Sequence, residues 1–417
     1  MKKLFIIVAA TLFVAGSFLP VMAQDKADWS FYGSARMWTE YRSVDKLTTR
    51  SAIVTNPLAG LNDEEELIWD LQSNSRVGAV VKWGNIGGQF EYGFGSTVSP
   101  RLLFGTWNFG PGTLLVGQDY QPSFWGISGQ CGFGGGDCGL INWGEMYTGR
   151  LPQIKLIMGG FQVALIKANT TQVFTAGSVT TTTVSVPAGA AGPPGGIFVT
   201  SDGVRDFYLV ASSAPNFSAV DIDTLLPKIE ASYVFNLGPA ALWAGAGYNS
   251  IDLEGQPNGT TRVDSKSLDS WFGAIGAKAN FGPFFVAGKF TYIRNPAAYG
   301  VVQDNGLTQA SYTFATNSIN DVDSMMSMLV VGFKLTDTIK FETGAGWITN
   351  SRDNAPGIEE EQETWSYYLQ MSWSPAKNVF IIPELGFVDY GDKKLTGSPD
   401  MEMGDAFYFA VKWQINF

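Results

Sequence analysis

The chain has 417 residues, of which only 16% are charged, and it contains 49 Gly, 29 Phe, 15 Tyr and 13 Trp with a formal net charge of −11. Soluble proteins carry about 25% charged residues, so this chain has little charge with which to cover a water-facing surface. It has no His, which excludes Ser-His-Asp triads, Cys-His pairs and His-ligated zinc. We expect no catalytic residue, metal or cofactor. The acidic balance also argues against nucleic-acid binding, because phosphate contacts need a basic face.

Residues 1–23, MKKLFIIVAATLFVAGSFLPVMA, have the three parts of a secretory signal peptide. Lys2 and Lys3 form the positive start, an apolar stretch follows, and the small-residue end predicts cleavage after Ala23. The alternative is an uncleaved membrane anchor. Cleavage removes two of the 27 basic residues and leaves 25 basic and 38 acidic residues. We expect the mature chain, 24–417, to form a single domain. No later stretch approaches the roughly 18 apolar residues that a membrane helix requires.

The mature chain alternates between apolar and polar residues with a period of two. At the C-terminus one parity is wholly apolar and comprises Phe407, Phe409, Val411, Trp413, Ile415 and Phe417. The intervening residues, from Tyr408 to Asn416, are mostly polar. Successive side chains of a strand point to opposite faces, so this pattern predicts a strand with one apolar and one polar face.

Sixteen segments share this pattern: 29–42, 67–83, 87–96, 100–109, 113–120, 147–158, 161–169, 227–237, 240–252, 269–281, 284–294, 324–335, 339–350, 363–373, 379–390 and 404–417. Their connections alternate between short turns, such as Gly238-Pro239, and long loops, such as 121–146 and 170–226. An even strand number with this asymmetry is typical of outer-membrane barrels. The sequence therefore predicts an all-β, antiparallel transmembrane barrel of 16 strands. The alternative is 18 strands, if a further segment, 204–212, and a partner strand for it join the barrel.

The two cysteines, Cys131 and Cys138, lie six residues apart in the Gly-rich run GQCGFGGGDCGL. In an exported protein disulfides persist, so we expect a local bridge that stiffens this loop. A metal site would need further ligands nearby, and the sequence supplies none there.

Several short motifs resemble those of the general bacterial porins. FYGSARMW at 31–38 and NSRVGAVVKWG at 74–84 look like the first two strands of that family, and GTLLVGQDYQP at 112–122 looks like the fifth strand entering the inward-folded third loop. MYTGRLPQIKL at 146–156 is similar to the strand that leaves this loop, and Phe417 resembles the family's assembly signal. The resemblance implies a homotrimeric, 16-stranded outer-membrane channel for ions and small hydrophilic solutes.

The same resemblance indicates where the pore is narrowest. In the family, basic residues of the wall face acidic residues of the third loop. The matching basic residues here are Arg76 and Arg150, with Arg36 one inward step beyond Ser34, and Gln118 stands where an Arg is common. The candidate counter-charges of the loop are Asp137 and Glu145, with Asp119 at its entry. The alternatives are a loop folded outward and arginines that only solvate the wall.

Two acidic runs, 63–66 and 359–361, lie in or beside predicted outer loops. They are expected to be solvated charge, with bridging of divalent cations to lipopolysaccharide as the alternative. The membrane lipid and lipopolysaccharide are in any case expected partners. The competing function is a structural or adhesive barrel that acts through its long loop 170–226. Known barrel enzymes use His, which this chain lacks.

Overall fold

The computed structural model describes residues 26–44, 64–95, 97–132, 139–170, 181–187, 196–201, 205–211, 221–224, 226–254, 257–258, 261–262, 266–313, 318–355, 358–398 and 400–417. The predicted signal peptide, Asp137 and Cys138 lie outside these ranges.

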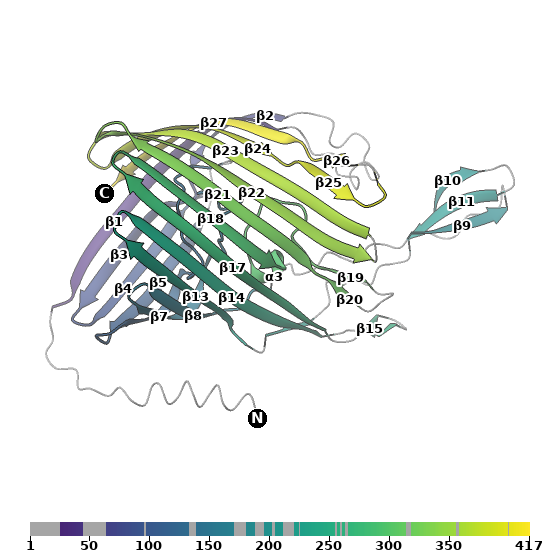
Figure 1. Ribbon diagram of the computed structural model, residues 1–417, viewed down its shortest axis with the longest axis horizontal. Helices are drawn as coiled ribbons and strands as arrows, with labels where there is room; N and C mark the ends of the chain where they lie inside the picture. The colour runs from purple at the N-terminus through teal and green to yellow at the C-terminus, as the bar shows by residue number, and fades with distance from the viewer. Residues whose placement is uncertain are drawn as a thin grey trace, which may run out of the picture.

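The described chain forms a closed antiparallel barrel of 16 strands (Figure 1). Some of these strands are interrupted and carry two labels. In order around the barrel they are β1 (Asp28–Val44), β2 (Glu64–Leu71) with β3 (Ser75–Trp83), β4 (Ile86–Phe94), β5 (Val98–Asn108), β6 (Thr113–Tyr120), β7 (Arg150–Met158), β8 (Phe161–Ile166), β12 (Asp221–Asp223) with β13 (Lys228–Leu237), β14 (Ala240–Glu254), β17 (Lys266–Phe281), β18 (Phe284–Arg294), β21 (Val322–Lys334), β22 (Ile339–Ala355), β23 (Ile358–Ala376), β24 (Val379–Asp389) with β25 (Asp392–Leu395), and β26 (Met401–Glu402) with β27 (Asp405–Asn416). All sixteen predicted segments are present in this order.

The first and last strands close the barrel. β1 pairs with β27 from Ser34↔Asn416 to Val44↔Ala406. Beyond this ladder, the backbone N–H of Gly33 donates to the carbonyl of Phe417 at 2.7 Å, and that of Phe417 donates to the carbonyl of Gly33 at 3.0 Å. The ring of Phe417 lies against the Cα of Gly33. Closure satisfies the edge-strand hydrogen bonds that would otherwise be exposed.

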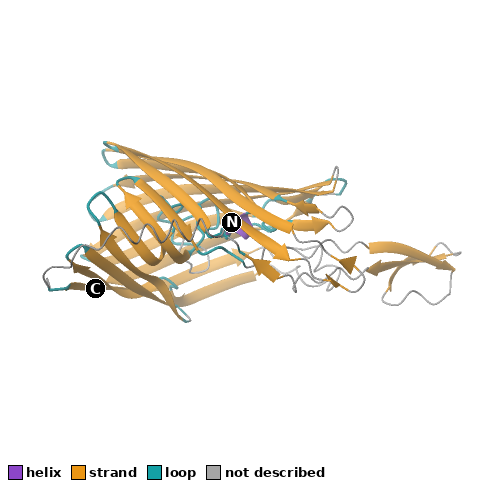
Figure 2. Cartoon of the chain, turned by 90° about the horizontal axis from the view of Figure 1, so that it is seen from below, coloured by secondary structure: helices purple, strands orange, loops and turns teal. Residues whose placement is uncertain are grey.

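The two rims differ in the length of their connections. At one rim, tight turns join β13 to β14 and β17 to β18, and their glycines, Gly238 and Gly282, have φ of 64° and 61°. Positive φ is readily adopted by glycine, which explains the Gly-Pro pairs of the predicted short turns. The long connections all leave from the opposite rim, as Figure 2 shows.

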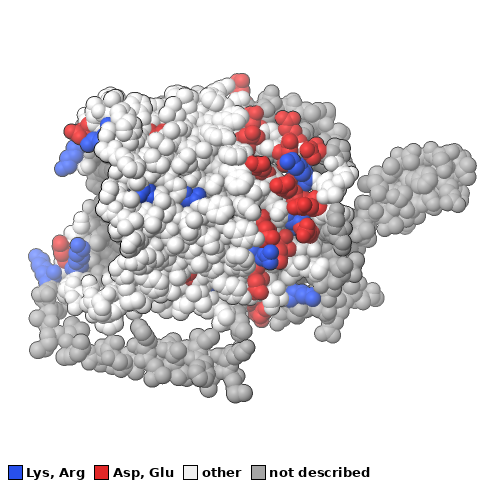
Figure 3. Space-filling model, in the orientation of Figure 1, with Lys and Arg blue, Asp and Glu red and all other residues white. Residues whose placement is uncertain are grey.

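The outer face of the barrel is apolar. Large side chains such as Phe31, Trp69 and Leu103 are exposed there by 74%, 71% and 61%. Figure 3 shows the wall almost free of charge, with acidic side chains gathered at the long-loop rim. The opposite parity is buried inside the barrel, including the fully buried Tyr408 and Ile348. The predicted alternation thus places the apolar face outward, as in a barrel surrounded by lipid.

A three-stranded sheet projects from the long-loop rim (Figures 1 and 2). It comprises β9 (Thr181–Pro187), β10 (Gly196–Ser201) and β11 (Arg205–Ala211), in the order β10-β11-β9. Within the segment predicted at 204–212, residues Arg205–Ala211 form β11 of this sheet, and the barrel keeps 16 strands.

The remaining elements are short. They are the helix α3 (Pro296–Tyr299), the hairpin β15 (Pro257–Asn258) with β16 (Thr261–Arg262), and the hairpin β19 (Ser311–Thr313) with β20 (Ser318–Asn320). Among the described residues, no helix is long and apolar enough to cross a membrane.

Candidate pore constriction

The segment between β6 and β7 runs along the inner wall of the barrel. The backbone N–H of Ser123 donates to Glu230 of β13 at 3.0 Å, that of Gly129 to Glu342 of β22 at 2.6 Å, and that of Cys131 to Glu384 of β24 at 2.7 Å. The three glutamates share the inward parity of their strands. Residues 121–132 and 139–149, which we call the constriction loop, therefore lie inside the barrel and follow the wall from β13 to β27.

Four further contacts fasten this loop to the wall. Glu145 forms a fully buried ion pair with Lys289 of β18, whose ammonium also donates to the carbonyl of Ser123 at 3.1 Å. The ring of Trp125 stacks on Trp243 of β14 at 5.9 Å, and Lys278 lies 5.6 Å from the centre of the Trp125 ring. Breaking a buried ion pair is strongly unfavourable, because it leaves a charge unpaired in a low-dielectric interior. The pair of Glu145 with Lys289 therefore holds the loop in one place.

The wall opposite the loop carries a chain of arginines. Glu91 of β4 accepts from Arg101 at 2.6 Å and lies 3.4 Å from Arg76. Tyr120 accepts from Arg150 at 3.1 Å and from Arg101 at 3.4 Å. Two guanidinium groups therefore contact Glu91, and a third, that of Arg150, is joined to them through the hydroxyl of Tyr120.

A cavity of about 280 Å³ separates the loop from this wall. On the wall side it is lined by Arg76 and Lys412. On the loop side the described residues are neutral and include Ser128, Gln130 and Ile141. The aromatic residues Tyr120, Phe124 and Tyr147 also line it. This cavity is our candidate pore constriction.

The structure brings together some of the residues predicted for the constriction. Arg76 lines the cavity, and Arg150 contacts its rim through Tyr120. Arg36 lies on the inner face of β1, where its Nε donates to Ser34 at 2.9 Å. Asp119 lies beside this wall and forms a 2.5 Å ion pair with Lys155.

Other predicted residues lie elsewhere. Glu145 is buried against Lys289 on the far side of the loop, away from the cavity. Gln118 pairs in register with Leu103 and Pro152, which are exposed on the outer face, so alternation directs it outward. Its amide donates to the carbonyl of Pro100 at 2.9 Å. Asp137 lies outside the described residues.

The predicted Cys131–Cys138 disulfide is not present, because Cys131 is a buried free thiol. Its Sγ lies 3.6 Å from the side-chain oxygen of Gln370 on the inner wall. Burial raises the pKa of this thiol to about 12. The loop is held by hydrogen bonds to the wall at this position, which is the stiffening that the bridge was expected to give.

Sequence reasoning missed Arg101 and Lys412. Arg101 lies at a β-bulge, where Glu91 pairs with Leu102 but Tyr92 pairs with Pro100. A bulge interrupts the two-residue period, so parity could not place Arg101. Lys412 is on the polar parity of the C-terminal segment, and this signal could have identified it as an inward-facing cation.

No protein-family model and no curated protein sequence matches the chain. Its structure is similar to the crystal structure of the outer membrane channel DcaP of Acinetobacter baumannii, with a TM-score of 0.60 and 15% identity, covering 95% of this chain and 100% of that one. It is also similar to the trimer form of OmpT, an outer membrane protein of Vibrio cholerae (0.51; 12%; 94% and 100%), and to the anion-selective porin from Comamonas acidovorans (0.50; 12%; 94% and 100%).

These likenesses establish the class of fold. The chain has the fold of the 16-stranded outer-membrane porins, which are channels and not enzymes. The resemblance of the short motifs to the general bacterial porins is therefore confirmed at the level of the fold.

Proposed function

We propose that the chain forms a water-filled channel across the outer membrane, through which ions and small hydrophilic solutes diffuse passively. The observation that carries this function is the cavity between the constriction loop and the arginines of the wall. Barrels of about 16 strands are wide enough to leave an aqueous bore. The loop narrows such a bore without adding any catalytic group, which suits a diffusion channel.

We propose further that the arginines set the selectivity. Arg76 and Arg101 contact Glu91, Arg150 donates to the neighbouring Tyr120, and Arg76 and Lys412 line the cavity, whose loop side is neutral over its described part. Positive charge that lines a pore favours anions over cations. Asp137 of the loop is the remaining candidate for an opposing acid. Rim charges weigh less, because their field is screened over about 8 Å at physiological salt.

The exposed apolar face is suited to membrane lipid, and the acidic rim of Figure 3 to lipopolysaccharide that is bridged to it by divalent cations. A homotrimer is proposed by analogy with the trimer form of OmpT.

The test is the single-channel conductance of the refolded mature chain in a planar bilayer with a salt gradient across it. We expect stepwise conductance with a reversal potential of the anion-selective sign, and three equal closing steps for a trimer. Arg76→Gln should move the reversal potential toward cation selectivity. Lys394→Gln is the matched control, because it makes the same charge change at an exposed position of β25 in the rim.

A second candidate function, adhesion, is favoured by the projecting sheet β9–β11. An adhesin need not conduct. If the folded barrel is silent in the bilayer, and deletion of 181–211 abolishes binding to surfaces, the channel function is rejected in favour of adhesion.

A further inference from the structure

A second segment of the chain lies inside the barrel. Residues 295–310, which we call the second inner segment, connect β18 to β19 and include α3. The side chain of Asn350 donates to the carbonyl of Leu307 at 2.7 Å, and Asn305 donates to Thr364 at 3.2 Å. Asn249 donates to the carbonyl of Ala298 at 3.1 Å. These partners are buried on the inner faces of β22, β23 and β14.

The second inner segment is joined to the constriction loop through the backbone. The N–H of Val302 donates to the carbonyl of Tyr147 at 3.0 Å, and that of Asp304 donates to the carbonyl of Asn142 at 2.9 Å. Their apolar side chains also share one cluster, in which Tyr299 and Val301 pack with Met146 of the loop. The two segments therefore form one continuous layer across part of the bore.

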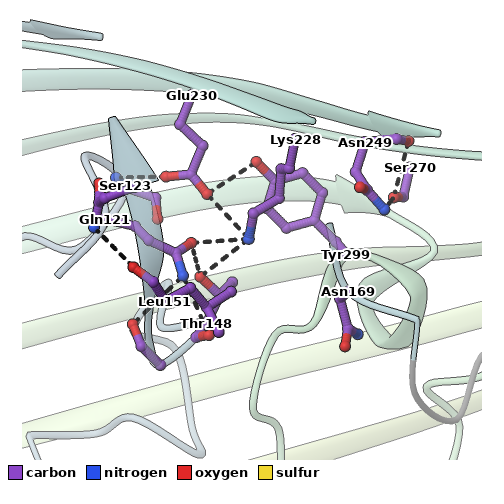
Figure 4. A network of polar contacts seen from close by, with 12 residues as sticks. Gln121, Ser123, Thr148, Leu151, Asn169, Lys228, Glu230, Asn249, Ser270 and Tyr299 are labelled. Carbon is purple, nitrogen blue, oxygen red and sulfur yellow. Dashed lines mark hydrogen bonds and ion pairs between the residues drawn. The ribbon is translucent and has the colours of Figure 1, made fainter. Parts of the chain in front are cut away.

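Lys228 lies where the two segments meet the wall (Figure 4). Its side chain is fully buried. Its ammonium donates to Gln121 Oε1 at 2.9 Å and lies 3.4 Å from Thr148 Oγ1, at the beginning and the end of the constriction loop. It also lies 3.5 Å from Glu230 and 4.7 Å from the centre of the Tyr299 ring.

Glu230 makes the matching set of contacts. It accepts from the backbone N–H of Ser123 in the constriction loop at 3.0 Å and from the hydroxyl of Tyr299 in the second inner segment at 3.1 Å. Gln121 and Thr148 are hydrogen-bonded to each other as well. One pair of neighbouring charges on β13 thus binds both ends of the loop and the second segment.

We propose that Lys228 and Glu230 are positioning residues that lock the constriction loop and the second inner segment into one unit, and that this unit sets the open cross-section of the channel. The proposal rests on the proposed channel function. Removing a hydrogen bond from a buried charge is unfavourable, and each segment supplies such contacts to Lys228 or Glu230, so neither can leave its place without losing them. The energetic coupling makes movement of either segment cooperative with the other.

The test compares the wild type with three variants in single-channel recordings. Tyr299→Phe removes the hydroxyl that binds Glu230 and keeps the ring over Lys228. Lys228→Met with Glu230→Gln removes both charges together, so that neither remains buried alone, and retains similar volume. Lys340→Met is the matched control, since Lys340 is an exposed lysine of β22 and is not among the buried groups that contact Gln121, Thr148 or Tyr299. Folding of each protein is checked by its heat-modifiable mobility.

We expect the fraction of open time spent in additional conductance levels to be about fivefold higher in the double variant than in the wild type. This change corresponds to loss of a coupling of about 1 kcal/mol. Tyr299→Phe should show a smaller effect of the same kind, and Lys340→Met none. If the double variant and Tyr299→Phe both fold and both show steady conductance like that of the wild type, the locking role is overturned and the channel function stands. A silent wild-type barrel would instead overturn the channel function itself.

Discussion

The backbone carbonyl oxygen of Trp143 lies directly against the Cα of Gly346, with no room for a methyl group between them. Gly346 is on the inner face of β22, paired in register with Met328 and Ser366. The neighbouring Gly144 approaches the carbonyl of Ser327 in the same way and has φ of 134°. Glycines on both sides therefore allow the constriction loop to lie flat against the wall.

Gly346→Ala is expected to push the loop toward the opposite wall and to lower the single-channel conductance. The atom that a new Cβ would meet belongs to the backbone, which cannot rotate away as a side chain can. The overpacking should cost about 1–3 kcal/mol of folding stability. Conductance in a bilayer and the denaturation midpoint of the folded barrel measure the two effects.

Gly273→Ala is the control for this change, because nothing lies within 4 Å of a Cβ at that position. An unchanged conductance in Gly346→Ala, equal to that of the control, would show that the loop does not set the open cross-section.

Much of the fold could be predicted because the barrel has a simple local rule. β6 and β18 begin and end at the predicted residues, 113–120 and 284–294. Each strand must direct apolar residues to lipid and polar residues to the lumen, so its two-residue period is imposed along its whole length. The tertiary structure adds little to that constraint, and a single sequence therefore reveals it.

The site was predicted less completely, because it depends on contacts between distant segments. The resemblance placed Gln118 in the pore, but alternation from the exposed Val116 directs it outward. The partner of Glu145 is Lys289, which is 144 residues away. The second inner segment lies between two predicted strands, 284–294 and 324–335, in a stretch to which the sequence assigned no structure. No local period marks a loop that packs inside a barrel.

Glu91→Gln is expected to increase the preference for anions. The change removes a carboxylate that contacts both Arg76 and Arg101 while keeping the size of the side chain. Because Arg101 is almost fully buried, loss of its ion pair with Glu91 should also destabilise the barrel by about 3 kcal/mol. The reversal potential in a salt gradient reports the first effect.

Glu359→Gln, an exposed residue of β23, makes the same change in net charge at the rim and should leave selectivity nearly unchanged. If both variants shift the reversal potential equally, the arginine wall does not determine selectivity.

Cys131 is expected to resist alkylation in the folded barrel and to react rapidly after unfolding. Burial raises the pKa of its thiol to about 12, so the reactive thiolate stays scarce between pH 7 and 9. The rate with a maleimide, measured in a Cys138→Ser background, should therefore remain low across this range. A Lys394→Cys variant provides an exposed thiol that reacts in the folded state.

The unmodified chain offers an independent check. Unfolded without reductant, it should expose two thiols. Zero thiols would mean that Cys131 and Cys138 do form a bridge.

Docking of the second inner segment is expected to strengthen as the pH falls. Burial raises the pKa of Asp304, whose carboxylate accepts from the hydroxyl of Tyr390 at 3.0 Å. A carboxyl group with a raised pKa in the docked state binds its proton more tightly there than in the undocked state. The protonated form thus favours docking, and this contribution is lost as the pH rises through the raised pKa. Hydrogen exchange of residues 301–310 at acidic and neutral pH measures the effect.

Asp304→Asn separates this effect from the general pH dependence of exchange, because the amide cannot ionise and still offers an oxygen to Tyr390. The variant should hold the segment at neutral pH as firmly as the wild type does in acid. The ratio of wild-type to variant exchange rates should therefore be greater than one at neutral pH and approach one in acid. A ratio that stays constant would show that Asp304 keeps its charge in the docked segment and does not couple docking to pH.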